Sequence, residues 1–187
     1  MGKYKLIVGL GNPEERFDGT RHNFGFRVVV KAVSTAGLTW CVDATSKALV
    51  ACGGHVVFVK PCTFMNLVGE CVGKLADRLG VSANEIIIVH DDTAFKLGTM
   101  KLKHGGSAHG HNGLASIALH LGSEDTDRLR LGIGRPEGVP MVSHVLGKFS
   151  DTEDPVVDKV VEAAASALVL YEMPFDKLAS KYNGSVL

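Results

Sequence analysis

The feature that most constrains the fold is an alternation of short apolar runs with longer stretches of helical periodicity. The short runs are rich in Val, Ile and Leu and are predicted to be strands: residues 4–9, 47–52, 55–60, 85–90, 99–103 and 128–133. The helical stretches are about 23–36, 65–79, 112–121 and 155–172, with a short final helix at 175–182. This alternation predicts an α/β domain whose central sheet is flanked by helices.

The connections between these runs predict a sheet of mixed direction. Gly53 and Gly54 separate two adjacent runs and predict a hairpin, whereas other runs are joined through helices and are expected to be parallel. The chain has no internal repeat or low-complexity linker, so residues 1–187 are predicted to form one three-layer domain. Ligands of such sheets usually bind beyond the carboxyl ends of the strands.

Two helix starts are predicted from their capping residues. In "DPVVDKVVEAAASALVL" Asp154 is the expected N-cap and Pro155 the first helical residue, and Pro174 follows the end of the helix. In "KPCTFMNLVGE" Asn66 is the expected N-cap of the helix at 65–79.

Composition narrows the class of protein. The 187 residues are 45% hydrophobic and 21% charged, which is ordinary for a soluble domain. No run approaches the roughly 18 apolar residues of a membrane span. The first ten residues do not resemble a signal peptide, and the four cysteines form no CxxC pair and predict small buried thiols. We therefore expect a cytoplasmic protein with no membrane partner. A mitochondrial or plastid protein that has lost its presequence would have the same sequence features.

The net charge is zero, but the charges are unevenly distributed. Residues 1–60 hold 8 Lys and Arg against 4 Asp and Glu, and residues 96–148 hold 7 against 4. If these segments share a face they would form a phosphate-binding surface; the alternative is an uneven solvated surface.

Three segments carry candidate chemistry. "GLGNPE" after the first strand suggests a dinucleotide-binding loop, but its third glycine position is Glu14, and Lys31 stands where an acid is needed. A tight turn that directs Asn12 off the strand end is the better interpretation. "VHDD" places Asp91 and Asp92 at another strand end, either for function or to cap a turn.

The third segment is the loop "KHGGSAHGHNG", which runs into a predicted helix. Its backbone N–H groups could bind an anion. Its histidines His104, His109 and His111 could alternatively bind a metal, although no further ligand lies nearby in sequence.

Taken together, seven segments occur in a characteristic order: "VGLGNP", "TRHN", "KPxTFMNLxGE", "VHDD", "GGxxxGHNGLxSI", "RLRxGIGRP" and "HVLGKFS". This series resembles the bacterial-type peptidyl-tRNA hydrolases, which include eukaryotic organellar members, over about residues 4–150. The resemblance implies a single α/β domain that hydrolyses the ester between a peptide and the 3′-terminal ribose of tRNA. It implies tRNA recycling after aborted translation, with no metal or organic cofactor. The partner would be the acceptor end of peptidyl-tRNA, and we expect a monomer.

The resemblance also implies roles for individual residues. His22 matches the catalytic histidine, Asp91 the acid that holds it, and Asn12 the amide that distinguishes blocked from free aminoacyl groups. The positions that the resemblance or the basic pattern assigns to substrate and tRNA binding are Phe17, Phe64, Met65, Asn66, His111, Asn112, Lys101, Lys103 and Arg130. The family usually has tyrosine at the position of Phe17 and glycine at that of Glu14.

These residue types suit ester hydrolysis. A neutral imidazole, with an ordinary pKa of about 6.5, can take a proton from water near neutral pH. A carboxylate on its other nitrogen fixes the tautomer and stabilises the imidazolium, and amides can stabilise the oxyanion. No GxSxG nucleophile motif is present, which favours direct attack by water. Two alternatives are an RNA-binding protein of this fold without turnover, as in an organellar splicing factor, and a metal-dependent esterase.

Overall fold

The computed structural model describes residues 5–170 and 172–186. Its strands are β1 (Lys5–Gly9), β2 (Cys41–Asp43), β3 (Ala48–Gly53), β4 (Val56–Pro61), β5 (Ile86–Asp92), β6 (Thr99–His104), β7 (Asp127–Gly132) and β8 (Gly184–Ser185). They form one sheet in the order β2-β3-β4-β1-β5-β7-β6-β8. The four central strands β4, β1, β5 and β7 are parallel, and the outer pairings are antiparallel. The predicted mixed sheet is confirmed, including the hairpin between β3 and β4.

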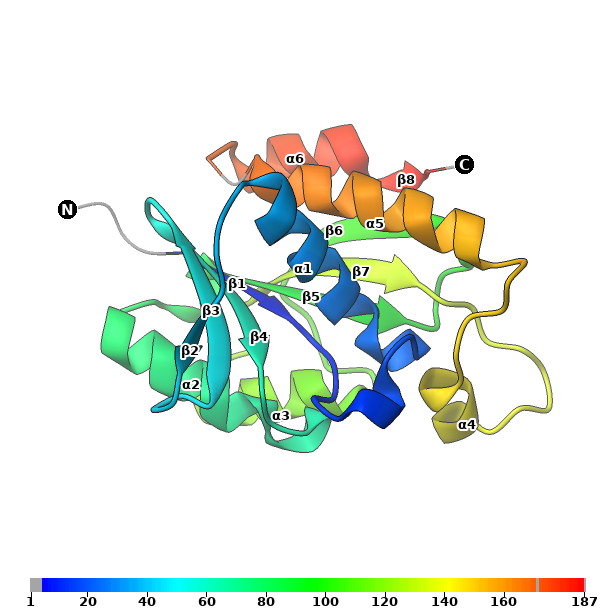
Figure 1. The fold of residues 1–187 in the computed structure, drawn as a ribbon, viewed down its shortest axis with the longest axis horizontal. Helices are drawn as coiled ribbons and strands as arrows, with labels where there is room; N and C mark the ends of the chain where they lie inside the picture. Colours follow the sequence, from blue (N-terminus) through cyan, green and yellow to red (C-terminus); the bar gives the residue numbers. More distant parts are fainter. Residues whose placement is uncertain (1–4, 171, 187) are drawn as a thin grey trace.

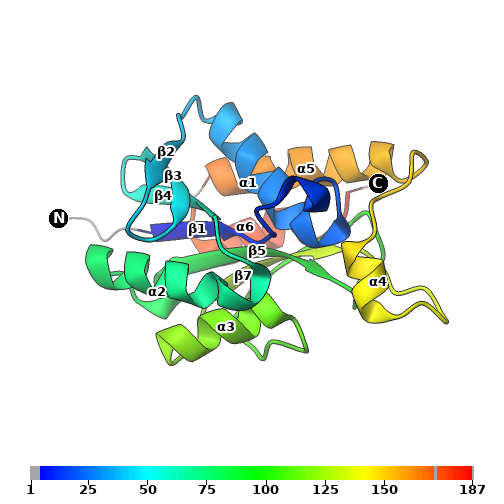
Figure 2. The ribbon, with the colours of Figure 1, turned by 60° about the horizontal axis from the view of Figure 1, so that its bottom comes forward.

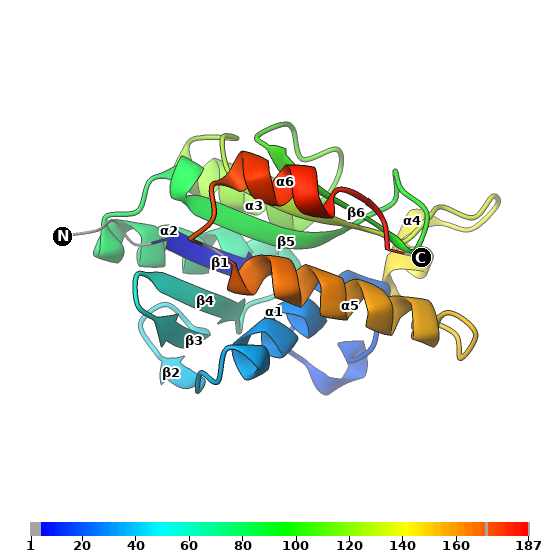
Figure 3. The same ribbon diagram turned by 90° about the horizontal axis from the view of Figure 1, so that it is seen from above.

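The helices cover the two faces of this sheet (Figure 1). They are α1 (Phe24–Thr35), α2 (Val68–Leu79), α3 (Asn112–Leu121), α4 (Met141–Leu146), α5 (Asp154–Val169) and α6 (Phe175–Tyr182). Helices α1, α5 and α6 lie on one face, as Figure 3 shows, and α2 and α3 lie on the other. The result is the predicted three-layer arrangement.

Both faces of the central strands are buried, because successive residues of a strand point to opposite sides. In β5, Ile87 and Val89 pack among the core residues under α1 and α5, whereas Ile86 and Ile88 pack under α2 and α3. This double burial explains why the central strands are continuous apolar runs. In the described residues no helix is both long and apolar enough to cross a lipid bilayer.

In the part of the chain that the structure describes, the connections include the 3-10 helices η1 (Glu15–Phe17), η2 (Arg21–Asn23), η3 (Met65–Leu67) and η4 (Ala83–Glu85). Two of them, η2 and η3, lead directly into α1 and α2. The short elements β2, α4 and β8 were not predicted, because two to six residues carry too little periodicity to detect. Tyr4 and Tyr171, at the ends of two predicted segments, lie outside the described residues.

Two predicted helix caps are wrong. Asn66 lies inside η3 with an exposed side chain, because the chain enters α2 through this 3-10 turn and Leu67 takes the N-cap position. Helix α5 has Glu153 as its N-cap, and Asp154 is already helical. The predicted burial of the cysteines is wrong for three of the four: Cys71, on α2, is buried, but Cys41, Cys52 and Cys62 are exposed, and all four are free thiols.

The first strand and first helix meet with their backbones almost in contact. A Cβ added to Gly25 would lie 2.2 Å from the carbonyl oxygen of Val89 and 2.6 Å from the amide nitrogen of Leu10. Any side chain at Gly25 would therefore push α1 away from the ends of β1 and β5. The glycine allows the turn just before α1 to lie beside the last residues of β5.

Candidate active site

The turn that carries His22 is η2, immediately before α1. Its start is fixed by Thr20, whose hydroxyl donates to the carbonyl of Phe17 at 2.7 Å and whose backbone forms a bridge with Lys148. Because α1 approaches β5 so closely, the imidazole of His22 lies over the carboxyl end of that strand. The sheet edge predicted to hold the site is where His22 lies.

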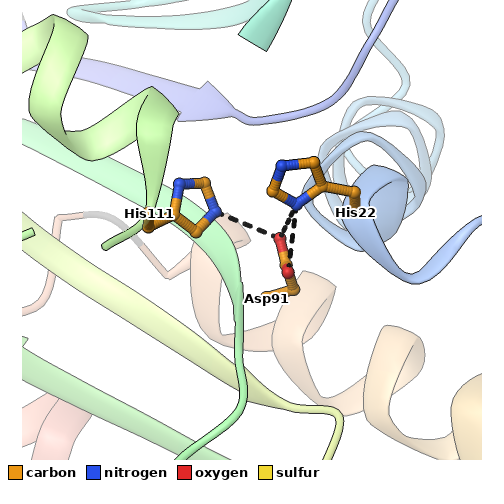
Figure 4. A group of neighbouring side chains, drawn as sticks. All are labelled: His22, Asp91 and His111. Atoms are coloured by element: carbon orange, nitrogen blue, oxygen red, sulfur yellow. Dashed lines mark hydrogen bonds and ion pairs between the residues drawn. The ribbon is translucent and has the colours of Figure 1, made fainter. Parts of the chain in front are cut away.

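Asp91 is the next-to-last residue of β5 and is buried. Nδ1 of His22 lies 2.9 Å from Oδ1 and 3.1 Å from Oδ2 of Asp91 (Figure 4). A carboxylate accepts hydrogen bonds, so the proton of the neutral imidazole is on Nδ1. Nε2 of His22 is then left with a free lone pair, as a general base requires.

His111 is a second imidazole on the same carboxylate. Its Nε2 lies 3.1 Å from Oδ1 of Asp91, and its Nδ1 accepts the backbone N–H of Gly113 at 3.2 Å (Figure 4). The bond from Gly113 fixes the tautomer, because Nδ1 must be unprotonated and Nε2 must carry the hydrogen. His111 is also the N-cap of α3. Asp91 therefore accepts two imidazole N–H groups, one from each side.

These contacts stabilise the ionised form of Asp91. Burial favours the neutral acid and would raise its pKa, but the charge attraction and hydrogen bond of His111, together with those of His22, outweigh burial. The pKa of Asp91 is held well below its usual range. The site therefore keeps a fixed negative charge beside His22 at any pH near neutrality.

A third imidazole, His90, lies behind this pair. Its Nδ1 donates to the carbonyl oxygen of Asp91 at 2.8 Å, and its ring meets that of His111 edge-on with centroids 5.1 Å apart. Burial, followed by the neighbouring His111, lowers the pKa of His90 to about 3. His90 is therefore a neutral packing residue, and it helps to hold the last residues of β5.

Asp92, the neighbour of Asp91, has a different environment. Its Oδ1 accepts the backbone N–H of Ala94 at 2.8 Å, and its Oδ2 accepts Nε of Arg130 at 2.6 Å. Of the two acids in "VHDD", Asp92 caps the turn after β5 and Asp91 faces the imidazoles. The capping interpretation of that motif therefore applies to Asp92, and Asp91 remains the candidate for function.

Asn12 lies beside η2 in a reciprocal amide pair. Its backbone N–H donates to Oδ1 of Asn23 at 2.8 Å, and Nδ2 of Asn23 donates to the carbonyl of Asn12 at 3.0 Å. The side-chain Oδ1 of Asn12 accepts the N–H of Met65 at 2.9 Å. This bond identifies Oδ1 as the anchored atom, which leaves Nδ2 as a donor for a ligand.

A cleft of about 390 Å³ opens beside the imidazoles. One wall is α4, with Met141, Val142 and Val145, and the opposite wall is the loop before α3 and the start of that helix, including Asn112. Of the predicted site residues, His22, Asp91, His111, Asn112 and Arg130 line this cleft.

The remaining predicted residues lie outside the cleft lining. Met65 is buried under α2 and α3, and Asn66 beside it is exposed. Phe17 and Phe64 meet edge to face with centroids 6.5 Å apart, although they are 47 positions apart in sequence. Asn12 and Phe17 thus belong to the segment after β1, and Phe64 and Asn66 to the segment after β4.

The predicted basic residues fall into two groups. Lys101 and Lys103 are exposed and lie opposite Arg130 and Arg128 in the antiparallel pair of β6 and β7. Arg130 is half-buried, bound to Asp92, with its guanidinium 4.6 Å from the ring centroid of Phe95. Arg128, two positions before Arg130 on β7, is buried and donates to the carbonyl of Ser107 at 2.6 Å. Its guanidinium thus supports the loop before α3.

The donor atoms of His22, Asp91 and His111 lie within 4.8 Å of one another, which is close enough to consider a metal. Both ring nitrogens that face Asp91 carry hydrogens, however, and the bond from Gly113 opposes moving the hydrogen of His111 to Nδ1. Within the described residues the histidines suggested as a metal set do not gather: His104 contacts Asp127, His109 contacts Ser107, and His111 contacts Asp91.

Sequence reasoning missed two contributors to this geometry, Asn23 and His90, and it did not recognise that His111 binds Asp91. Asn23 and His90 stand within the quoted motifs "TRHN" and "VHDD". His111 directly precedes the predicted helix 112–121, and an N-cap position was the available signal for it.

A neutral imidazole held by a buried carboxylate, at the carboxyl edge of an α/β sheet, is the arrangement of enzymes that use histidine as a general base. A family model described as peptidyl-tRNA hydrolase matches residues 6–186. The chain belongs to the peptidyl-tRNA hydrolase family.

Individual relatives agree with this membership. The peptidyl-tRNA hydrolase of Akkermansia muciniphila is 43% identical over 170 residues, 90% of this chain and 89% of that protein. That of Caldanaerobacter subterraneus subsp. tengcongensis is 39% identical over 185 residues, 96% and 99% of the two chains. The crystal structure of the peptidyl-tRNA hydrolase from Acinetobacter baumannii superposes with a TM-score of 0.89 at 32% identity and covers 99% of this chain and 97% of that one.

Proposed function

We propose that this chain hydrolyses the ester bond of peptidyl-tRNA with His22 as the general base and Asp91 as its partner. Family membership makes peptidyl-tRNA hydrolysis the activity of the chain. The observation that supports the proposed roles is the bond from Nδ1 of His22 to Asp91, which leaves Nε2 free. A water molecule on Nε2 would lose its proton as it attacks the ester carbonyl, and the fixed charge of Asp91 would stabilise the imidazolium.

Asn12 and Asn112 are the proposed hydrogen-bond donors to the acyl part of the substrate. The backbone N–H of Met65 donates to Oδ1 of Asn12, so the Nδ2 hydrogens of Asn12 would face a carbonyl oxygen of the substrate. A donor that meets the developing oxyanion is typically worth about 3 kcal/mol of transition-state stabilisation. Asn12 could also bind the amide carbonyl on the blocked nitrogen of the substrate. A free aminoacyl group has no such carbonyl.

The other contacts proposed for substrate are on the rim of the site. Phe17, Phe64, Met65 and Asn66 lie near Asn12, and His111 lies beside the reacting ester. Lys101 and Lys103 are exposed on the same face of the sheet as α2 and α3, in a part that these helices do not cover. They would bind tRNA phosphates. Lys103→Ala should flatten the dependence of KM on salt by about one unit of log–log slope. Arg130 is a weaker candidate, because Asp92 already balances its charge.

We further propose that residues 1–187 act as one domain and as a monomer. We also propose that the chain acts in the cytoplasm or an organellar matrix, where ribosomes make peptidyl-tRNA. Light scattering on the purified protein tests the oligomeric state. A dimer at micromolar concentration would contradict it.

The experiment that tests the function is single-turnover hydrolysis of N-acetyl-aminoacyl-tRNA and free aminoacyl-tRNA by the purified chain. We expect the chain to hydrolyse the blocked substrate, and we expect this activity to persist when a metal chelator is added. Equal rates on both substrates would contradict the role of Asn12, and activity lost with the chelator would favour a metal-dependent esterase. The non-catalytic RNA-binding alternative is not favoured, since the relatives matched over most of their length are hydrolases. Binding of tRNA without turnover would support that alternative.

A further inference from the structure

Arg21, next to His22 in η2, contacts a part of the chain more than 120 positions away through its backbone, two of its guanidinium nitrogens and the face of an aromatic ring. Its backbone N–H donates to the carbonyl of Gly147 at 3.0 Å, and Nη1 donates to the carbonyl of Lys148 at 2.9 Å. Nη2 lies 3.1 Å and 2.8 Å from the two carboxylate oxygens of Glu153. The guanidinium also lies 5.0 Å from the ring centroid of Phe149. The chain therefore holds η2 against residues 147–153.

Residues 147–153 connect the wall of the cleft to the helix layer. They follow α4, which lines the cleft, and they end at Glu153, the N-cap of α5. Figure 2 shows α4 beside the segment that leads into α1. The side chain of Arg21 thus binds both the segment that follows α4, at Lys148, and the start of α5, at Glu153. A planar guanidinium can do this because its donors have a fixed fork geometry.

The local structure is arranged to accommodate this side chain. A Cβ on Gly147 would lie 3.2 Å from Nη1 of Arg21 and 3.1 Å from the carbonyl of Ser143, so a larger residue there would crowd the guanidinium. Oε2 of Glu153 also accepts the backbone N–H of Ser150 at 2.8 Å and the Ser150 hydroxyl at 3.0 Å. The side chain of Arg21 is only 13% exposed. Nη2 alone contacts both oxygens of Glu153, and a partly buried, charge-assisted hydrogen bond of this kind is stronger than an exposed ion pair.

We propose that Arg21 is a positioning residue for the hydrolytic reaction. By holding η2 to the end of α4 and to Glu153, it keeps His22 in hydrogen-bonding contact with Asp91 and fixes the distance between His22 and the α4 wall. Arg21 does not line the cleft and acts through His22. The proposal rests on the proposed function, in which His22 is the base.

A matched control is available on the same pair of helices. Arg27 of α1 forms an ion pair with Asp158 of α5 at 3.1 Å, with Arg27 32% and Asp158 70% exposed. This pair joins α1 to α5, and among the described residues neither side chain hydrogen-bonds to η2. Arg27→Met removes a link between α1 and α5 and should leave His22 in place.

The test compares Arg21→Met with Arg27→Met by steady-state kinetics on N-acetyl-aminoacyl-tRNA. Arg21→Met should lower kcat by about 10- to 100-fold, with KM within about threefold of wild type, because a base displaced by about 1 Å can lose this much rate. Arg27→Met should keep kcat within about twofold. A kcat for Arg21→Met equal to that of the control, or a change in KM alone, would overturn the proposal.

A second readout separates this proposal from the assignment of His22 as base. The measurement is the proton NMR signal of the hydrogen-bonded Nδ1–H of His22, which is identified by its absence in His22→Ala. This proton should exchange faster with solvent in Arg21→Met than in wild type and in Arg27→Met. If His22→Ala keeps wild-type turnover, the proposed function fails while this signal still reports on positioning. An unchanged signal in Arg21→Met would overturn the positioning role. If Arg21→Met does not fold, Arg21→Lys and Glu153→Gln replace it, and both should show a kcat between those of wild type and His22→Ala.

Discussion

Carboxylate–imidazole clusters lie at Asp91 and at Asp127, and their hydrogen bonds are arranged in opposite ways. At Asp91 one buried carboxylate accepts N–H groups from two imidazoles, His22 and His111. At Asp127 one imidazole, His104, contacts two carboxylates: Nδ1 meets Asp127 and Nε2 lies 3.1 Å from Asp176. The first cluster lies at the carboxyl end of β5, and the second at the amino end of β7.

The difference lies in the number of free ring nitrogens. Both nitrogens of His104 face acceptors, so the ring makes both bonds only as an imidazolium and has no lone pair for catalysis. Its ring also packs on Phe175, with centroids 4.3 Å apart, and so attaches α6 to β6. In the Asp91 cluster both rings can be neutral, and Nε2 of His22 remains available. A histidine beside an acid is a candidate base only when its second nitrogen is free.

The largest effect expected from this comparison is on His22. His22→Ala should fold and bind tRNA but lose on the order of 10²–10⁴ in kcat, the usual contribution of general-base catalysis. The matched variant His104→Ala should keep kcat within about twofold, because its ring is a structural ion-pair partner. Measured turnover of N-acetyl-aminoacyl-tRNA decides this, and a similar loss in both variants would remove the distinction between the clusters.

Asp91→Asn should give the next largest loss. Oδ1 of Asp91 already accepts both imidazoles, and an amide oxygen could do the same, so the substitution removes mainly the charge. kcat should fall, and the acidic limb of the pH–rate profile should move to lower pH, because the lost negative charge had favoured the protonated imidazole. The double variant with His22→Ala should be little worse than His22→Ala alone. Additive losses, or an unmoved limb, would make Asp92 the acid to test.

His111→Phe should have a smaller effect of opposite sign on the pH profile. Removing its N–H leaves the charge of Asp91 less balanced, so the protonated form of His22 is favoured and the acidic limb should move to higher pH. We expect kcat at the pH optimum to fall by roughly tenfold or less, because the substitution disturbs the position of Asp91 and His22 but keeps His22 as the base. His120→Phe, on the exposed end of α3, is the control. A shift to lower pH would mean that His111 does not share Asp91.

The smallest effect concerns the stability conferred by the Asp127 cluster. Burial alone would lower the pKa of His104, but its hydrogen bonds to Asp127 and Asp176 outweigh burial and raise it. A raised pKa contributes stability that is complete below the unfolded value of about 6.5 and is lost as pH rises through the folded value. The Tm of wild type should therefore exceed that of His104→Gln more at pH 6 than at pH 8.5. Since His104 is 60% exposed, we expect a shift of a few degrees at most. A Tm difference that is equal at both pH values would exclude an imidazolium in this cluster.

Much of the fold followed from local pattern. The predicted strands and long helices are present, and helices 112–121 and 175–182 have the predicted ends. These elements were predictable because burial on one or both faces imposes a period on the sequence. The order of the seven motifs also indicated the family that the comparisons show.

Which side chains meet was decided by the tertiary structure alone. Adjacent residues of a strand point to opposite faces, so "VHDD" by itself could not assign Asp91 to the imidazoles and Asp92 to Arg130. The position before a predicted helix sets His111 apart from His104, but the local sequence does not show that His111 meets Asp91 and His104 meets Asp127. Sequence determined the elements and the residue types at their ends, because these depend on local periodicity. The hydrogen-bond partners, and with them the ring nitrogen left free for chemistry, depend on how β5, η2 and α3 converge at the edge of the sheet.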